Sequence, residues 1–458
     1  MKIYNAITKT KEEFKPIVDG QVSMYHCGPT VYDYIHIGNL RSFMLGDIIR
    51  RSFEYLGFET KQVMNITDVG HLVSDGDDGD DKMTKALKRH EMDITLENML
   101  KVADIYSESF KTDLKNLNIL TPHHLPKASD HIPENIVIIE KLFEKGFAYT
   151  TSDGVYFDTK KMPDYGKLGG LNLDAESESR IETNSEKRFH ADFALWKFDE
   201  KNGWDSPWGH GFPGWHIECS GMSMKYLGET FDIHTGGYDN KSVHHNNEIA
   251  QSECSTGKTF VNYWLHGEFL NLDGEKLSKS TGGNITLMTL FNKGFSPLDL
   301  RYLYLQSIYR SQTDFTWEII ESSKKALDKI YRHIEALKTQ HGIGKINPDF
   351  QKKFSDAISD DFNLPIALSI FHNMMKSDIS AIDKLATAYN FDTVLGLDLE
   401  KHTSIEIEIS DEVQTLLNDR KIARENKDWE SSDQIRDKIM EKGFKVSDIN
   451  GEQKIETL

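Results

Sequence analysis

The sequence has few cysteines, no long apolar run and fewer basic than acidic residues. Its three cysteines, at positions 27, 219 and 254, are odd in number and widely spaced, which argues against a disulfide framework. No stretch approaches the roughly 20 apolar residues that a membrane-spanning helix needs. The opening MKIYNAITKTKEEF lacks the apolar segment of a secretion signal. We therefore expect a cytoplasmic protein.

The charge balance limits the partners that the chain can bind without local structure. Lys and Arg number 54 against 73 Asp and Glu, for a net charge of −19. A surface of this sign does not suit a non-specific binder of polyanions, although a local basic face can still contact a nucleic acid. With 458 residues, the chain exceeds one hydrophobic core and should form about two to four domains.

The first segment has the pattern of a parallel α/β sheet. Residues 21–27 alternate like a strand, residues 39–57 place their apolar side chains on one helical face, and residues 61–66 form the next strand. Gly57 ends the helix. This strand–helix–strand order predicts a Rossmann-type α/β fold with a parallel sheet.

The remaining chain divides by changes of pattern. Residues 95–117 predict an amphipathic helix, residues 133–146 a shorter one, and Ser152-Asp153-Gly154 a hairpin turn; a strand is expected over 261–272. The acidic stretch 74–82 lacks the ligand order and closing Glu of an EF-hand, so a solvated loop is favoured over a calcium loop. We predict six parts: a first half of the sheet domain (1–117), a connective insertion (118–208), a second half (209–265), a following region (266–310), an α-helical bundle (311–400) and a small C-terminal domain (401–458).

The string HIGN at 36–39 lies between the first strand and the first helix. Ligands of α/β sheets bind at this edge, and a helix N-terminus offers free N–H groups to phosphate. His36 can donate a hydrogen bond, Gly38 leaves room beside the backbone, and Asn39 offers an amide. Taken alone, a His-x-Gly at a helix start is also an ordinary helix cap.

The string KLSKS at 276–280 follows a turn after the last predicted strand. Lys276 and Lys279 can neutralise the charge that grows on a departing pyrophosphate. Alone, such a loop is also a plain solvated basic loop. The two strings in this order, about 240 residues apart, resemble the class I aminoacyl-tRNA synthetases, which activate an amino acid as its adenylate and then esterify tRNA.

Four residues between and before these strings have the chemistry of a zinc site. Cys27 ends the first strand, Cys219 lies in GWHIECS, and His244 and Glu248 are four residues apart on one helical face. Two thiolates, an imidazole and a carboxylate form a plausible zinc ligand set. The alternatives are packed cysteines and a surface His–Glu pair.

Longer strings point to one family. CGPTVYDYIHIGN, NITDV at 65–69, FALWK at 193–197, GWHIECS, HHNNEIAQS, GEKLSKS and DDFNLPIAL at 360–368 resemble those of the cysteinyl-tRNA synthetases, in that family's order and over nearly the whole chain. The resemblance implies one Zn²⁺ per chain on Cys27, Cys219, His244 and Glu248, directly bound by the substrate thiolate. Because cysteine and serine are similar in size, shape alone discriminates between them weakly.

The resemblance also implies roles for other residues. His245 competes with His244 as a ligand, and the family pattern favours His244. Trp215 and Thr67 would contact the substrate cysteine, although Trp215 is also a plausible core residue. In HTGGYDN, His234 and Asp239 are expected at the adenosine, with Gly236 and Gly237 allowing close approach; a plain glycine turn is the alternative. Cys254, which no motif surrounds, is expected to be a buried small residue.

Several positions depart from the family pattern. Asn39 stands where a second His is common, and Leu277 replaces Met, a change that conserves volume. Thr235 interrupts a more glycine-rich string, and Ser242-Val243 replace an aromatic-proline pair. The resemblance implies that 1–117 and 209–265 are the halves of the catalytic domain, that 266–310 is the KLSKS and tRNA stem-contact region, and that 401–458 is the anticodon-side domain. In that last domain Gly451-Glu452-Gln453-Lys454 replaces the usual Gly-Thr-x-Trp, so no anticodon contact is assigned.

The implied reaction uses ATP with Mg²⁺, L-cysteine and tRNA(Cys), in a monomer that makes no membrane contact. His36 and the helix N-terminus would stabilise the transferring phosphate, while Lys276 and Lys279 would stabilise pyrophosphate; Gly38, Asn39, Gly236, Gly237 and Asp239 would also contact ATP. One alternative is a ligase that joins cysteine to an amino-sugar through the same core. Another is a non-catalytic relative that only binds tRNA or amino acid.

Overall fold

The computed structural model describes residues 1–69, 82–171, 186–272, 275–276, 285–339, 342–401, 410–426, 428–449 and 452–457. These residues form two compact units, Met1–Glu400 and Lys401–Leu458. Most of the predicted acidic loop at 74–82 and of KLSKS lies outside the described residues. None of the described helices combines the length and apolar character that a membrane span requires.

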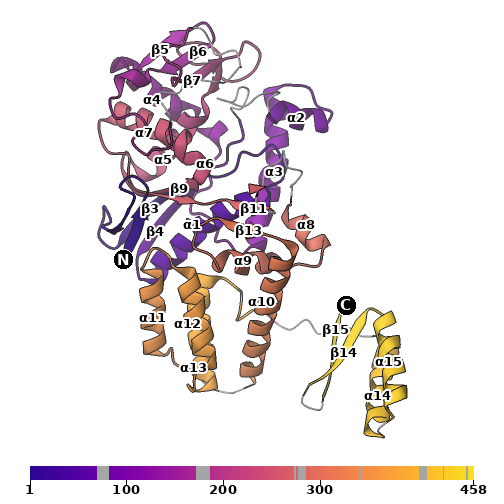
Figure 1. Ribbon diagram of the computed structural model, residues 1–458. Coiled ribbons are helices and arrows are strands. Elements are labelled where there is room, and N and C mark those ends of the chain that lie inside the picture. The colour runs from indigo at the N-terminus through magenta and orange to yellow at the C-terminus, as the bar shows by residue number, and fades with distance from the viewer. Residues whose placement is uncertain are drawn as a thin grey trace. The chain divides into compact units, whose positions relative to one another are not determined.

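A parallel four-stranded sheet forms the centre of the first unit (Figure 1). Its strands pair in the order β10-β9-β3-β4, and every pair is parallel. This confirms the predicted α/β class, because a parallel sheet requires helical crossovers between its strands. The strands are β3 (Gln21–His26), β4 (Glu59–Met64), β9 (Phe231–Gly237) and β10 (Val261–Gly267).

Both faces of this sheet are buried, each in a separate hydrophobic core. Met24 and Ile233 pack with α1 (Ile37–Tyr55) in one core. Tyr25 and Trp264 pack with residues of α5 and α7 in the other. Alternate strand residues point to opposite faces, so strands covered on both sides show nearly continuous apolar runs. Helix α1 corresponds to the helix predicted over 39–57 but begins and ends two residues earlier. Gly57, at φ 90°, follows its C-cap.

The inserted part builds a second, antiparallel sheet. Its four strands follow the order β5-β6-β7-β8, and the predicted hairpin turn at 152–153 joins the first two. Strand β8 belongs to this sheet although it lies beyond residue 208, because three residues are too few to show a pattern. The elements are α2 (Lys82–Arg89), α3 (Leu96–Asn116), α4 (Ile132–Glu144), β5 (Ala148–Thr151), β6 (Gly154–Phe157), β7 (Phe193–Phe198) and β8 (Gly211–Pro213).

The chain then returns to the parallel sheet and leaves it again. The single strand expected over 261–272 is wrong: it is two strands, and after Gly267 the chain enters a separate three-stranded sheet. There β11 pairs antiparallel with β12 and parallel with β13. The elements are α5 (Trp215–Leu227), α6 (Tyr238–Ser242), α7 (His244–Thr256), β11 (Leu270–Leu272), β12 (Glu275–Lys276) and β13 (Thr313–Phe315); the N-terminal strands β1 (Lys2–Asn5) and β2 (Thr10–Glu13) pair with each other.

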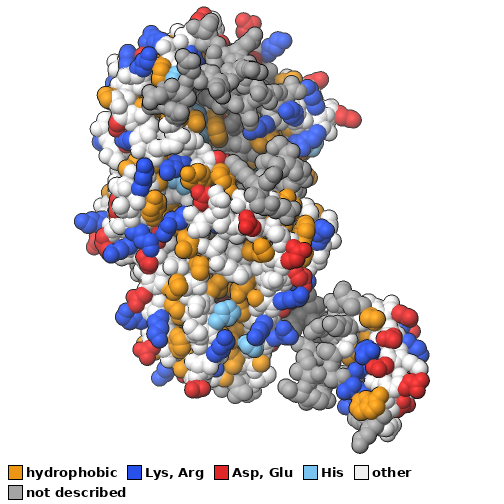
Figure 2. All heavy atoms as spheres, viewed as in Figure 1, with side chains coloured by type: hydrophobic (Ala, Val, Ile, Leu, Met, Phe, Trp, Pro, Cys, Tyr) orange, Lys and Arg blue, Asp and Glu red, His pale blue; other side chains and the backbone are white. Residues whose placement is uncertain are grey.

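Helices complete the first unit at the end opposite the insertion (Figure 1). Phe354 and Phe391 stack at 4.1 Å between α11 and α13. Pro365 lies in the first turn of α12, where a missing N–H is tolerated. Charged side chains of both signs are interspersed on the visible face of this bundle (Figure 2). The helices are α8 (Leu287–Asn292), α9 (Pro297–Leu305), α10 (Trp317–Lys338), α11 (Pro348–Ile358), α12 (Leu364–Lys376) and α13 (Ala381–Leu395).

The second unit is a helical pair with a hairpin, drawn in yellow in Figure 1. Helices α14 (Asp411–Glu425) and α15 (Trp429–Glu441) precede β14 (Phe444–Ile449) and β15 (Glu452–Thr457). Its small core consists of Val413, Leu417, Ile439 and Val446.

Candidate metal centre and active site

The predicted site residues gather at the carboxyl edge of the parallel sheet. Cys27 follows β3, and its N–H donates to Thr235 O at 2.9 Å, near the end of β9. Thr67 follows β4 and its N–H donates to Pro29 O at 3.0 Å. Helix α1 begins at the same edge with His36 as its N-cap. Parallel strands end together, so residues that are far apart in the sequence meet here.

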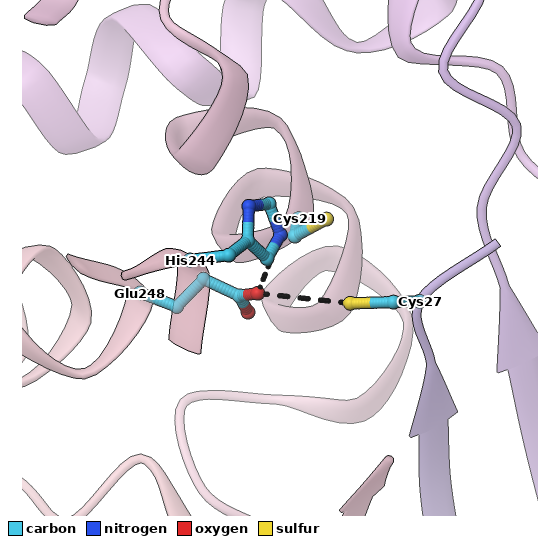
Figure 3. A group of neighbouring side chains, drawn as sticks. All are labelled: Cys27, Cys219, His244 and Glu248. Carbon is cyan, nitrogen blue, oxygen red and sulfur yellow. Dashed lines mark hydrogen bonds and ion pairs between the residues drawn. The ribbon is translucent and has the colours of Figure 1, made fainter. Parts of the chain in front are cut away.

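Cys27, Cys219, His244 and Glu248 form one buried cluster (Figure 3). Their candidate ligand atoms all lie within 4.8 Å of one another. Glu248 Oε1 is 2.9 Å from His244 Nε2 and 3.8 Å from Cys27 Sγ. The loop after β3 contributes Cys27, α5 contributes Cys219, and α7 contributes His244 and Glu248, which share a helical face because they are four residues apart.

The cluster carries an excess of acidic groups. A hydrogen bond from Cys27 lowers the pKa of Cys219 to about 6, while burial raises the pKa of Cys27 itself well above its usual value. Burial lowers the pKa of His244, but Glu248 and Cys219 outweigh this effect and raise the pKa to about 10. The protein alone therefore balances these groups with protons, which a bound cation would displace.

The donor set fits zinc. With bonds of about 2.0 to 2.3 Å, the ligand atoms of a tetrahedral zinc site lie roughly 3.3 to 3.8 Å apart, close to the separations in this cluster. Neighbouring histidines also orient the ligands. His234 Nε2 lies 2.8 Å from Glu248 Oε2, and His216 Nδ1 lies 2.9 Å from His244 Nδ1. The second contact occupies Nδ1 and leaves Nε2 of His244 to face the cluster.

His245 belongs to a second, overlapping set. Cys27, His234, His245 and Glu248 also have ligand atoms within 4.8 Å of one another. His245 Nε2 lies 3.3 Å from Cys27 Sγ, and its Nδ1 lies 2.8 Å from His266 Nε2. This set has one sulfur where the first has two, and zinc prefers thiolate ligands. The first set therefore suits zinc better.

The start of α1 carries the residues that are expected to contact phosphate. His36 Nδ1 accepts a hydrogen bond from the Asn39 N–H at 3.2 Å. Gly38 is half-buried and Asn39 is exposed, so the first turn of the helix can be reached from solvent. In KLSKS, the structure describes the backbone of Lys276 in β12, whereas residues 277–280, including Lys279, lie outside the described residues.

Of the two glycines of HTGGYDN, Gly236 has a packing reason of its own. A Cβ on Gly236 would lie 2.7 Å from His245 Cε1, and one on Gly237 would lie 2.5 Å from Asp239 Oδ1. The His245 ring is buried, so the first position has no room for a side chain. Asp239 is exposed at the start of α6, and its carboxylate can move away from the second position. Gly236 thus lets β9 approach α7.

His234 corrects a sequence-based expectation. We expected it at the adenosine, but its side chain is fully buried, bonded to Glu248 and stacked on Trp264 at a centroid distance of 4.6 Å. It contacts the buried cluster of Cys27, Cys219, His244 and Glu248 instead. We call this group the metal cluster, because its donor set fits zinc. Cys254 also differs from expectation, since it is half-buried rather than buried.

The two residues expected at the substrate cysteine differ in exposure. Trp215 is 37% exposed and its ring lies 4.4 Å from that of His244, so it covers the outer side of the cluster. Thr67 is buried and its hydroxyl accepts from Asn65 Nδ2 at 3.0 Å.

Known proteins resemble this chain over its whole length. It is 43% identical to cysteine–tRNA ligase 1 of Burkholderia lata, covering 99% of this chain and 96% of that protein. It is 41% identical to the cysteine–tRNA ligase of Chlorobaculum tepidum, covering 98% and 97%. The profile of the tRNA synthetases class I (C) catalytic domain matches residues 13–325.

The chain belongs to the cysteinyl-tRNA synthetase family. The profile of the cysteinyl-tRNA ligase anticodon binding domain matches residues 407–455, within the second unit. The comparisons give no support to the amino-sugar alternative. A methionyl-tRNA synthetase of Mycobacterium tuberculosis, bound by methionyl-adenylate, shares the fold with a TM-score of 0.56 at 11% identity, covering 82% of this chain and 90% of that one.

In this member of the cysteinyl-tRNA synthetase family, sequence reasoning missed two histidines beside the cluster. His216 and His266 are buried, and they contact His244 and His245 respectively. His216 lies next to residues already singled out, in GWHIECS. His266 stands at the end of β10, where no motif marks it.

Proposed function

We propose that this protein ligates L-cysteine to tRNA(Cys) through a cysteinyl-adenylate. The observation that carries the proposal is the buried cluster of two thiols, an imidazole and a carboxylate beside the start of α1. This cluster supplies the means to select cysteine, and the helix start supplies a place for phosphate. Full-length similarity to cysteine–tRNA ligases supports the assignment.

In the first step, a carboxylate oxygen of cysteine attacks the α-phosphorus of ATP, which Mg²⁺ accompanies. The bond from the α-phosphorus to the bridging oxygen breaks, and pyrophosphate leaves. His36 and the positive end of the α1 dipole stabilise the transferring phosphate. Lys276 and Lys279 stabilise the pyrophosphate, and Gly38, Asn39 and Asp239 lie along the nucleotide. Positioning and electrostatics suffice, since no side-chain nucleophile is needed.

Cys27, Cys219, His244 and Glu248 would hold one zinc ion. When bound, zinc supplies a Lewis acid that takes a thiolate in preference to a serine hydroxyl. The protein's own part is to keep the ligands oriented, through His234 on Glu248 and His216 on His244. Trp215 and Thr67 border the amino-acid pocket.

In the second step, a hydroxyl of the 3′-terminal ribose of tRNA attacks the adenylate carbonyl carbon and AMP leaves. The second unit recognises the anticodon side of the tRNA, as its family match suggests. The proposed zinc site needs no residue from a second chain, and we propose a monomer.

Two assays test the proposal. Purified protein should catalyse cysteine-dependent exchange of pyrophosphate into ATP and should charge tRNA(Cys) with cysteine, but not with serine at equal concentration. Exchange without charging would refute the tRNA ligase. Elemental analysis should find about one zinc per chain; a metal-free protein with full activity would refute the proposed role of zinc.

The role of Lys279 has its own test, because the structure does not describe its position. Lys279→Ala should reduce pyrophosphate exchange by about 100-fold or more, because the variant lacks the positive charge that stabilises the departing pyrophosphate. Lys293→Ala, at the C-cap of α8 and over the ring of Trp317, is the matched control and should keep normal exchange. Normal exchange in Lys279→Ala would refute the assignment.

A further inference from the structure

Arg41 is a buried arginine in the second turn of α1, five residues after His36. It is only 5% exposed. Its two terminal nitrogens donate to five oxygen atoms from two separate segments: Nη1 to Glu268 O and Phe269 O, both at 2.8 Å, and Nη2 to Ser311 O at 2.7 Å, Ser307 Oγ at 3.2 Å and Ile308 O at 3.3 Å.

The partners of Arg41 show what its side chain is suited to do. Four of the five acceptors are main-chain carbonyls, so the hydrogen bonds fix backbone positions rather than another side chain. A planar guanidinium presents several N–H groups at fixed angles and can hold two segments at once. A lysine ammonium has three donors and cannot reproduce this geometry.

Both segments held by Arg41 precede strands of the sheet that contains Lys276. Glu268 and Phe269 immediately precede β11, and Ser307–Ser311 precede β13. Strand β11 lies between β13 and β12, and β12 contains Lys276. Arg41 therefore fixes the entrance to this three-stranded sheet against α1.

The chain on the other side of KLSKS is also attached to the start of α1. The Ile37 N–H donates to Ile285 O at 2.8 Å, and His36 forms a β-bridge with Thr286. The start of α1 thus contacts the chain after KLSKS directly, while Arg41 contacts the chain before it at Glu268 and Phe269, ahead of β11 and β12.

We propose that Arg41 is a positioning residue for adenylate formation, which holds β11, and through it β12 with Lys276, against the start of α1. The inference rests on the proposed function, since it concerns the step in which Lys276, Lys279 and His36 act on the same triphosphate. Arg41 acts through the backbone it holds and does not touch the substrate.

The expected consequence is a slower chemical step with an intact amino-acid site. A displacement of about 1 Å in catalytic groups can cost about 100-fold in rate. The metal cluster is built from α5, α7 and the end of β3, which Arg41 does not contact. Arg41→Met should therefore slow adenylate formation about 100-fold while zinc content and the KM for cysteine stay unchanged.

Single-turnover formation of adenylate from radiolabelled ATP at saturating cysteine separates positioning from folding. The amplitude reports the fraction of competent molecules, and the rate constant reports the chemistry of each. We expect a full amplitude and a reduced rate constant for Arg41→Met, and an intermediate rate for Arg41→Lys. Only a positioning role predicts this graded rate at constant amplitude.

Arg51→Met is the matched control. Arg51 is a buried arginine of the same helix, and it binds Asp47 and the carbonyls of Asn118 and Thr393 rather than β11. Its variant should lose stability and keep the rate constant of each competent molecule.

A wild-type rate constant in Arg41→Met would overturn the inference and leave the proposed function standing. A fall in amplitude alone would also overturn it, because Arg41 would then be purely structural. Wild-type protein that forms no cysteine-dependent adenylate would overturn the proposed function, and this inference with it.

Discussion

Two buried clusters of charged groups in the first unit differ in how their charge is balanced. The metal cluster gathers two thiols and a carboxylate around one histidine, with Glu248 held at a pKa of about 2 because His234 and His244 outweigh its burial. The second cluster lies where α1, α9 and α13 meet: Asp47 binds Arg51 at 2.9 Å and Arg301 at 2.7 Å. Both clusters are almost fully buried.

The difference lies in what completes each cluster. Arg301 also donates to the carbonyls of Leu395 and Leu117, so the ion-pair cluster satisfies its charges with groups of the protein. In the metal cluster, neighbouring acidic groups face each other and share protons. A buried cluster whose charges are met by ion pairs and carbonyls of the protein joins helices, whereas one with excess acid is suited to a cation.

The largest effect should come from removing a thiolate. Cys219→Ala should abolish stoichiometric zinc and reduce cysteine-dependent pyrophosphate exchange by more than 100-fold, because only three of the four proposed protein ligands remain. Elemental analysis and exchange kinetics measure both. Cys254→Ala, which changes a cysteine outside the cluster, should retain zinc; equal zinc in the two variants would contradict the comparison.

Removing the central charge of the other cluster should destabilise the fold without removing zinc. Asp47→Ala leaves two buried arginines unpaired and should lower the free energy of unfolding by about 3 to 5 kcal/mol. Urea denaturation gives this value. The triple variant Asp47→Leu, Arg51→Met, Arg301→Met should be far less destabilised. A larger loss in the triple variant would show that the ion pairs themselves stabilise the protein.

A smaller effect is expected for a histidine that orients a ligand. His234→Phe removes the contact to Glu248 Oε2 and should weaken zinc binding about 10- to 100-fold while leaving the metal stoichiometry at saturating zinc unchanged. Competition with a chromogenic chelator measures the affinity. Wild-type affinity would show that His234 does not orient Glu248.

The smallest effect should appear in acid. Burial raises the pKa of Asp47, but Arg301 and Arg51 outweigh it and lower the pKa below its usual value. A lowered folded pKa stabilises the protein above the unfolded value of about 4, and this contribution is lost as the pH falls through the folded pKa. The stability difference between wild type and Asp47→Asn should therefore shrink below about pH 4 and stay constant from pH 5 to 7. A difference that shrinks between pH 5 and 7 would contradict the assignment.

The sequence predicted the elements of the catalytic core better than their partners. Helix α1 and strands β3 and β4 lie within about two residues of their expected bounds, because the apolar periodicity of each depends on local burial. The expected strand over 261–272 was wrong because both β10 and β11 are apolar. Nothing local indicates that the chain changes sheets after Gly267.

The site shows the same division. Spacing and family strings identified Cys27, Cys219, His244 and Glu248, which the structure brings within 4.8 Å of one another. They also suggested the wrong surroundings for His234, since a Gly-rich string at a strand end is equally typical of a nucleotide loop. Arg41 was read only as part of a helix, because its partners lie more than 220 residues away.

The sequence by itself determined the chemistry available to this protein: a helix start suited to phosphate, two lysines in one short string, and a zinc ligand set of known composition. These features are local, since each depends on residue type and short spacing. Only the tertiary structure decided which histidines surround Glu248, which cluster is completed by the protein itself, and how Arg41 of α1 holds the chain before β11. Those contacts join residues from separate elements, and packing of the two cores on the sheet brings them together.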